Sequence, residues 1–154
     1  FKSLQSHRVA SWLWENSRHT LAHYFQSRTS EVYGVDIHPA AKLGKGIMID
    51  HGTGVVIGET SVIKDNVSIF QGVTLGGTGK ETGDRHPKVM EGVLLSASST
   101  VLGNVQIGRN AKIAAGSVVL EDVKEGTTVA GVPAKEVSQA VDNVPADEID
   151  HLIE

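Results

Sequence analysis

The sequence predicts a mainly β protein: a parallel β-helix of hexapeptide repeats with α-helices at its N-terminal end. Thirteen positions, all Ile, Leu or Val, recur six residues apart in three runs, Ile37–Ile49, Ile57–Leu75 and Val89–Val119. Neither the helical period of 3.6 nor the strand period of 2.0 produces this spacing. It is typical of a solenoid in which each unit is a short strand plus a corner and one side chain per unit points inward.

The residues before the repeats predict two helices. Apolar side chains recur at helical spacing between Leu4 and Phe25, with a junction expected near Glu15–Arg18 and an end before Gly34. We expect residues 1–33 to be the end of a larger helical domain that caps the solenoid. Residues 34–133 are expected to form the β-helix, and residues 134–154 a C-terminal tail.

Composition narrows the class of function. The chain has 14 Lys and Arg against 18 Asp and Glu, so no basic surface is predicted for nucleic acid. No apolar run approaches the roughly 20 residues that cross a bilayer, and no signal-peptide pattern opens the chain. With no cysteine, disulfides, thiolate catalysis and Cys-ligated metal are excluded. We therefore expect a cytoplasmic protein without a nucleic-acid or membrane partner.

Two interruptions of the repeat are the candidate site. The first, between Ile49 and Ile57, contains the segment DHGTG; the second, between Leu75 and Val89, is glycine-rich and contains GDRHP. A regular coil cannot accommodate a polar segment as long as the second interruption, so we expect an exposed loop there. Insertions of this kind often carry the function of a repeat protein.

Six segments in and around these interruptions resemble the serine O-acetyltransferase family: VDIHPAA (35–41), GIMIDHGTG (46–54), IGET (57–60), GVTLGGTGK (72–80), GDRHP (83–87) and AGVPA (130–134). The hexapeptides alone would indicate only the wider acyltransferase superfamily. The resemblance implies a left-handed helix with three hexapeptides per coil, assembled as a homotrimer or a dimer of trimers. It also implies transfer of an acetyl group from acetyl-CoA to the hydroxyl of L-serine, the first step of cysteine biosynthesis, without a metal.

The chemistry of acetyl transfer identifies the expected catalytic residues. A hydroxyl nucleophile needs a base, and the developing oxyanion needs hydrogen-bond donors. His51 is the expected base, because imidazole titrates near neutrality and this residue lies in the first interruption. By resemblance, Asp36 orients that imidazole from about one coil away, while Glu59 and His86 are further residues of the catalytic site. A solvated corner acid is the alternative for Glu59.

The resemblance also assigns the binding residues. Asp50 is expected to bind the amine of serine, and Arg85 and His86 its carboxylate, a task that suits the planar guanidinium. For acetyl-CoA, the amide of Gly77 is the expected oxyanion donor, and the remaining contacts are Thr78, Ala97, Lys112 and Ala115. The family also uses an aspartate of its N-terminal helical domain, for which no position here matches.

Other interpretations stay open. An acetyl-CoA-dependent O-acetyltransferase of a sugar or xenobiotic would share the repeats but not the GDRHP segment. A β-helical carbonic anhydrase would need three histidines on zinc, and His19 and His23 are the close histidine pair here. A non-catalytic scaffold is the third possibility. Some family members bind O-acetylserine sulfhydrylase through a C-terminal tail that ends in isoleucine, whereas this chain ends Ile153-Glu154.

Overall fold

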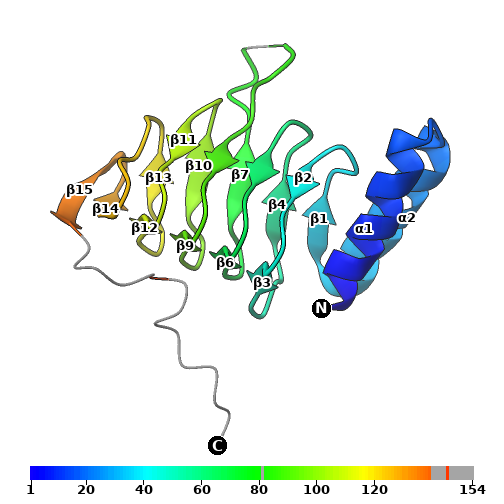
Figure 1. The fold of residues 1–154 in the computed structure, drawn as a ribbon, viewed down its shortest axis with the longest axis horizontal. Helices are drawn as coiled ribbons and strands as arrows, with labels where there is room; N and C mark the ends of the chain where they lie inside the picture. Colours follow the sequence, from blue (N-terminus) through cyan, green and yellow to red (C-terminus); the bar gives the residue numbers. More distant parts are fainter. Residues whose placement is uncertain (81, 140–144, 146–154) are drawn as a thin grey trace, which may run out of the picture.

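The computed structural model describes residues 1–80, 82–139 and 145. Two helices, α1 (Lys2–Glu15) and α2 (His19–Tyr33), precede a parallel solenoid, and a short antiparallel pair of strands follows it (Figure 1). The predicted β-helix and the two predicted helices are therefore confirmed. Helix α2 ends where Gly34 adopts a left-handed φ of 66°, a conformation that glycine accepts at low cost.

The strands form three sheets, one on each face of the solenoid. Sheet A contains β1 (Val35–Ile37), β4 (Val55–Ile57), β7 (Thr74–Gly76), β10 (Thr100–Leu102) and β13 (Val118–Val119). Sheet B contains β2 (Lys42–Leu43), β5 (Val62–Ile63), β8 (Lys88–Val89) and β11 (Gln106–Ile107). Sheet C contains β3 (Met48–Ile49), β6 (Ser68–Ile69), β9 (Leu94–Leu95), β12 (Lys112–Ile113), β14 (Thr127–Gly131) and β15 (Ala134–Gln139).

The strand register shows how the two interruptions are accommodated. A regular coil has 18 residues, as in the pairing of Val56 with Thr74, which corresponds to three hexapeptides. The first interruption lengthens the coil to 20 residues, since Val35 pairs with Val55. The second lengthens it to 26, since Val62 pairs with Lys88. Both insertions lie in corners between strands, so the ladders on either side keep their pairing.

The periodic aliphatic side chains form the core. Eleven of the thirteen are buried, and the other two, Leu43 and Ile49, are partly buried against the same cluster. Burial of this aliphatic column is the main favourable contribution to folding, at roughly 25 cal/mol per Å² of apolar surface. The repeat thus gives a rigid wall on which the corners are fixed.

Both ends of the solenoid are covered. Helices α1 and α2 pack together, α2 packs on β1, and Leu4 of α1 joins the core cluster. At the other end, β14 and β15 pair antiparallel. Residues 134–139, expected as the start of the tail, are thus part of this strand pair; the rest of the expected tail, Pro145 apart, lies outside the described residues. Among the described helices, none is long and apolar enough to cross a membrane.

Candidate active site

Most of the predicted site residues lie on two different edges of the solenoid. We call the corners between sheets A and B (38–41, 58–61, 77–87 and 103–105) the loop edge. We call the corners between sheets C and A (50–54, 70–73, 96–99 and 114–117) the His51 edge. In Figure 1 the loop 77–87 projects at the top, whereas β3, which leads into the His51 edge, lies at the bottom. The two interruptions are thus at opposite ends of sheet A.

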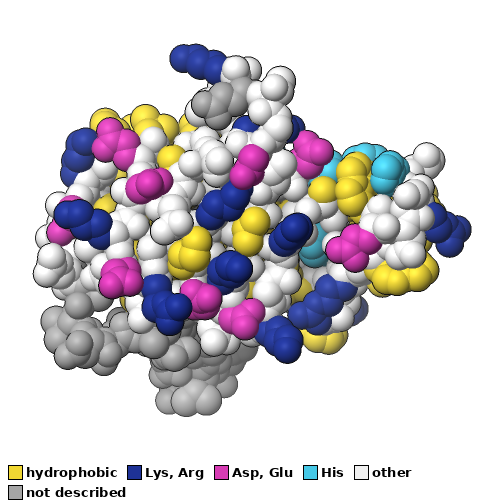
Figure 2. All heavy atoms as spheres, turned by 45° about the horizontal axis from the view of Figure 1, so that its top comes forward, with side chains coloured by type: hydrophobic (Ala, Val, Ile, Leu, Met, Phe, Trp, Pro, Cys, Tyr) yellow, Lys and Arg dark blue, Asp and Glu magenta, His cyan; other side chains and the backbone are white. Residues whose placement is uncertain are grey.

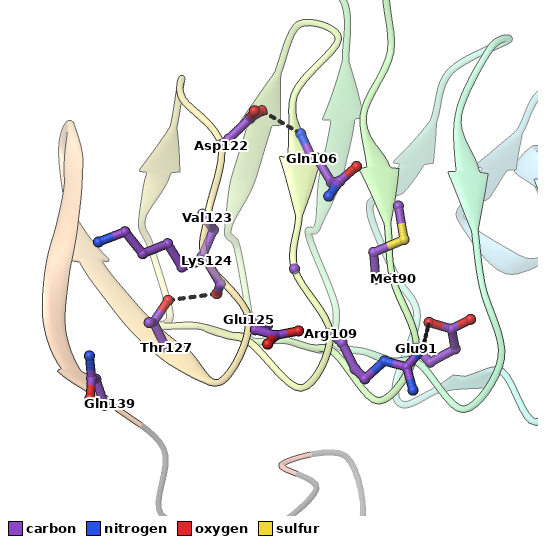
Figure 3. A pocket seen from close by; sticks show the side chains of 11 residues that line it. Met90, Glu91, Gln106, Arg109, Asp122, Val123, Lys124, Glu125, Thr127 and Gln139 are labelled. Atoms are coloured by element: carbon purple, nitrogen blue, oxygen red, sulfur yellow. Dashed lines mark hydrogen bonds and ion pairs between the residues drawn. The ribbon is translucent and has the colours of Figure 1, made fainter.

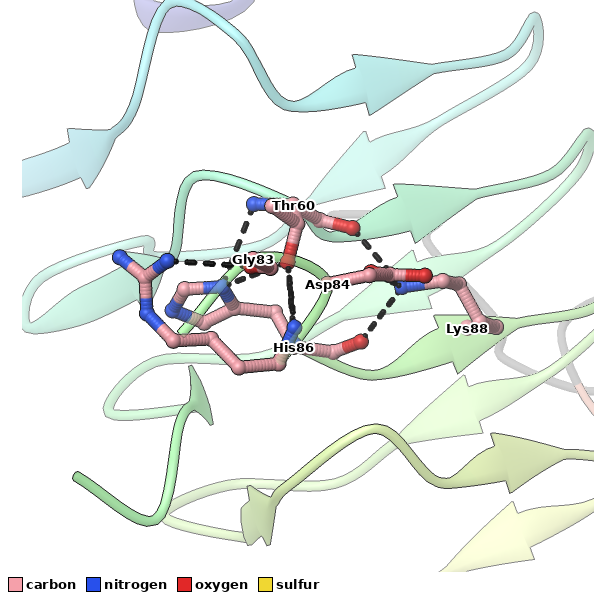
Figure 4. A network of polar contacts seen from close by, with 6 residues as sticks. Thr60, Gly83, Asp84, His86 and Lys88 are labelled. Carbon is pink, nitrogen blue, oxygen red and sulfur yellow. Dashed lines mark hydrogen bonds and ion pairs between the residues drawn. The ribbon is translucent and has the colours of Figure 1, made fainter. Parts of the chain in front are cut away.

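Thr60 organises the loop edge (Figure 4). Its hydroxyl oxygen accepts the backbone N–H groups of Arg85 (3.0 Å) and His86 (3.1 Å). Its own backbone N–H donates to Nδ1 of His86 (3.2 Å), and its hydroxyl lies 2.9 Å from the same nitrogen. One threonine from the preceding coil therefore fixes both the backbone of the loop and the imidazole that the loop carries.

These contacts define the tautomer of His86. Because the backbone N–H of Thr60 can only donate, Nδ1 of His86 is the acceptor nitrogen. The neutral imidazole then carries its proton on Nε2. His86 is 7% exposed, and burial, followed by the nearby positive charge of Arg85, lowers the pKa of its imidazole. This residue is suited to donate a hydrogen bond from Nε2, which is the role expected of a carboxylate-binding group.

Gly58 provides the space for that imidazole. A Cβ atom at this position would overlap Cδ2 and Nε2 of His86. The residue is a half-buried corner residue of the loop edge, directly after β4. The absence of a side chain here is therefore a requirement of the His86 position.

Charged side chains fix the rest of the loop. Nη2 of Arg85 donates to the Glu59 carboxylate (2.9 Å), and this hydrogen bond is the main reason that the pKa of Glu59 is lowered. Nζ of Lys88 donates to Asp84 (2.6 Å) and to the carbonyl oxygens of Thr60 and His86. Three predicted site residues, Glu59, Arg85 and His86, are thus brought together in one ordered cluster.

The His51 edge is different. His51 has a left-handed φ of 57°, which is uncommon for a residue with a side chain. Its backbone N–H donates to Oδ1 of Asp50 (2.9 Å), and its Nε2 lies 3.9 Å from Oδ2 of the same carboxylate. The imidazole is 73% exposed. Two predicted cofactor residues share this edge: the carbonyl of Ala97 accepts the N–H of Gly116, next to the exposed Ala115.

Asp36 does not contact His51 within this chain. Its side chain lies on the outer side of β1, between the buried Val35 and Ile37, and Oδ1 accepts a hydrogen bond from Nε2 of Gln26 (2.7 Å). Among the described residues no hydrogen bond joins Asp36 to His51, so the expected dyad is not formed in the single chain.

The remaining predicted cofactor residues, Gly77, Thr78 and Lys112, do not share one edge. Gly77 begins the loop at the loop edge, where an added Cβ would lie 3.3 Å from Cγ of Arg85. Thr78 is exposed beside Gly103 of the next coil. Lys112 lies in β12 of sheet C, paired with Leu94. No single surface of the chain therefore contains all five residues that are expected to bind acetyl-CoA.

The sequence did not single out Thr60, Gly58 or Gln26. The first two lie in the IGET segment, in which the sequence points to Glu59 only. The signal available for Gly58 was a glycine at a corner that faces an inserted loop. For Gln26 there was no local signal, because its partner Asp36 is ten residues away in the next element.

Other polar groupings were compared with this site. A cavity of about 670 Å³ lies at the corners between sheets B and C, beside the Glu91–Arg109 ion pair (Figure 3), and it contains none of the predicted residues. In the part of the chain that the structure describes, no group of three or more His, Cys, Asp or Glu is arranged to hold a metal ion. The geometry required by a carbonic anhydrase is therefore not found there.

Comparisons with known proteins agree with the hexapeptide fold. The family described as "Bacterial transferase hexapeptide (six repeats)" matches residues 86–121. Serine acetyltransferase of Salmonella typhimurium is 55% identical over 150 residues, which cover 97% of this chain and 55% of that protein.

Two solved structures of relatives are also similar. Serine acetyltransferase from Brucella abortus, in complex with coenzyme A, has a TM-score of 0.89 at 56% identity, covering 90% of this chain and 55% of that one. The Neisseria gonorrhoeae enzyme in complex with serine has a TM-score of 0.86 at 57% identity, covering 88% and 55%. The chain spans about half the length of these relatives. Over nearly all of its own length, the chain is a homologue of the serine acetyltransferases.

Proposed function

We propose that this chain carries the acetyl-transfer site of a serine O-acetyltransferase, which converts L-serine and acetyl-CoA to O-acetyl-L-serine and CoA. The observation that carries the proposal is the pair of donors at the loop edge, Arg85 and the Nε2–H of His86, held by Thr60 and Glu59. A guanidinium beside a neutral imidazole N–H suits a small carboxylate. The serine and coenzyme A complexes of the two relatives support the same substrates.

In the proposed mechanism His51 removes the proton from the serine hydroxyl as the oxygen attacks the thioester carbonyl. The tetrahedral intermediate places negative charge on the former carbonyl oxygen, and the amide of Gly77 is the proposed donor to it. Collapse of the intermediate breaks the carbon–sulfur bond, and the departing thiolate takes the proton from the imidazolium. Without a cysteine, and without an activated serine motif, direct transfer is favoured over an acyl-enzyme.

Substrate orientation follows from the charges at the two edges. Asp50, half-buried beside His51, is the proposed partner of the serine amine. Arg85 and His86 are the proposed partners of its carboxylate. The hydroxyl would then lie near the base, because one small amino acid spans both sets of groups.

This arrangement requires more than one copy of the chain. The base and the amine-binding carboxylate lie at the His51 edge, whereas the carboxylate-binding donors and Asp36 lie at or near the loop edge. We propose a homotrimer in which the His51 edge of one protomer faces the loop edge of the next, because a cyclic heterologous contact closes all three sites. The groove between them would also unite Gly77 and Thr78 with Ala97 and Ala115. A dimer of trimers, sulfhydrylase binding and a cytoplasmic location stay predictions.

The test is thiol release from acetyl-CoA with and without L-serine, for the wild-type chain and for His51→Ala. Serine-dependent release should fall at least about a hundredfold in the variant. His151→Ala, which changes a histidine in the C-terminal segment, is the control and should retain wild-type activity. Release that is equal with an acceptor sugar, or that is unaffected by His51→Ala, would contradict the assignment and favour a transferase for another acceptor.

A further inference from the structure

Gln26 of α2 connects the helical cap to the outer side of β1. Its Nε2 donates to Oδ1 of Asp36 at 2.7 Å, and its Oε1 lies 3.0 Å from Nδ1 of His23. The Gln26 side chain is half-buried, and α2 packs on β1 at this point. The amide therefore lies between a ring on its own helix and a carboxylate on the solenoid.

The direction of these hydrogen bonds is determined by chemistry. An ionised carboxylate can only accept, so the NH₂ group of Gln26 must face Asp36. The amide oxygen then faces His23, whose Nδ1 must carry a hydrogen. His23 thus holds the amide in the orientation that donates to Asp36.

His23 is itself held by aromatic contacts. Its ring lies edge-on to Trp14, with ring centroids 5.2 Å apart, and edge-on to His38 at 5.4 Å. Trp14 in turn stacks on His19 at 4.2 Å. Histidine side chains gather between the projecting loop and the N-terminal helices in Figure 2. These ring contacts hold His23 in place, and His23 in turn holds Gln26 against Asp36.

We propose that Gln26 is a positioning residue for acetyl transfer. By holding Oδ1 of Asp36, it leaves Oδ2 directed to accept the imidazole N–H of His51 from the neighbouring protomer. The carboxylate of Asp36, held in this orientation, would stabilise the imidazolium that forms during proton transfer. The inference rests on the proposed function and adds the helical cap to the catalytic machinery.

Gln26→Met tests this, because methionine keeps the length of the side chain and removes the donor. The value of kcat should fall about tenfold, the size expected for a lost hydrogen bond to a charged group. The KM values for serine and acetyl-CoA should stay within about twofold of wild type, because Gln26 acts through Asp36. His23→Ala, at an exposed position, should lower kcat by a smaller factor.

Gln5→Met is the matched control. Gln5 is a half-buried glutamine on α1 whose amide oxygen accepts a hydrogen bond from Arg8, at 3.4 Å on the surface. Its kcat should equal that of the wild type. Gln26→Glu keeps the shape but places a carboxylate against Asp36, so at about pH 8 its kcat should lie below that of Gln26→Met. Thermal melting of each variant reports whether the fold is retained.

The proposal is overturned if Gln26→Met retains the wild-type kcat, or if Gln5→Met loses as much. It is also overturned if Gln26→Glu is as active as the wild type, because shape alone would then be sufficient. A wild-type chain without serine-dependent thiol release would overturn the proposed function itself, and the inference with it. The two failures are therefore distinguishable in one set of assays.

Discussion

At the loop edge, the side chains proposed to bind substrate are each held by several hydrogen bonds, whereas at the His51 edge the proposed base contacts little beyond its neighbouring carboxylate. His86 is 7% exposed and bonded to Thr60, while the His51 imidazole is 73% exposed. A base that is mostly in water is poorly oriented for catalysis. The contrast is what the proposed trimer requires, since the side chain of His51 would be oriented by a neighbouring protomer.

The largest expected effect is at Gly58. In Gly58→Ala the new Cβ overlaps the His86 imidazole, which must move away from Thr60. A displacement of this size should lower kcat/KM for serine about a hundredfold. Steady-state kinetics with serine as the varied substrate measures the change.

Gly76→Ala is the matched control for that substitution. Ile57 pairs with Leu75, so Gly76 occupies the equivalent position one coil further on. A Cβ there would meet only the flexible end of Leu102, at 3.0 Å, and a side chain of Thr74. If both variants lost the same activity, the loss would reflect damage to the coil, and the proposed role of Gly58 would be wrong.

The next effect is on the pH dependence of stability, through a buried histidine of the helical cap. His7 of α1 is buried, and burial lowers its pKa from 6.5 to about 4. As pH falls below 6.5 the unfolded chain binds a proton that the folded chain does not, so the free energy of unfolding falls. From pH 7 to pH 5 this residue should contribute a loss of about 2 kcal/mol.

Urea denaturation at the two pH values measures this loss. His7→Gln should reduce the difference, whereas Gln5→Met, a substitution on the same helix that removes no titratable group, should retain the wild-type difference. The burial of His86 also lowers its pKa, and its contribution has the same sign. An equal reduction of the difference in both variants would contradict the assignment of this loss to the His7 imidazole.

A smaller effect is expected at Thr60. Thr60→Val removes the hydroxyl that accepts two backbone N–H groups of the loop but keeps the backbone donor to His86. The KM for serine should rise about tenfold with a smaller change in kcat. Thr60→Ser keeps the hydroxyl and should restore most of the affinity; if it did not, the methyl packing of Thr60 would be the important property.

Much of the fold was predictable because the residues that repeat in the sequence are the residues that form the core. One aliphatic side chain per hexapeptide points inward, so the period, both interruptions and the helices before Gly34 could be located from the sequence. The assignment of residues 134–139 to the tail did not anticipate the β14–β15 pair. That pairing depends on the open edge of the last coil, which no local pattern reveals.

The residues of the candidate site could be proposed from the sequence, and their roles stay predictions; their arrangement could be foreseen only in part. His51, Arg85 and His86 could be named because they lie in the two interruptions. The prediction that Asp36 and His51 are close rested on their spacing along the coil. In the structure Asp36 lies within β1, whereas His51 lies in the corner between β3 and β4. The contacts of Thr60 and Gln26 are tertiary, between elements 25 and ten residues apart respectively, and a single sequence does not contain them.

The central claim, that each site takes His51 from one protomer and Arg85 from the next, is tested most directly by complementation. His51→Ala and Arg85→Ala chains, each inactive alone, are co-expressed with different tags and purified as mixed assemblies. In a cyclic trimer that contains both variants, one of the three sites has both wild-type residues, so serine-dependent thiol release should return to about a third of the wild-type rate. Mixed assemblies that stay as inactive as either variant alone would contradict the shared site.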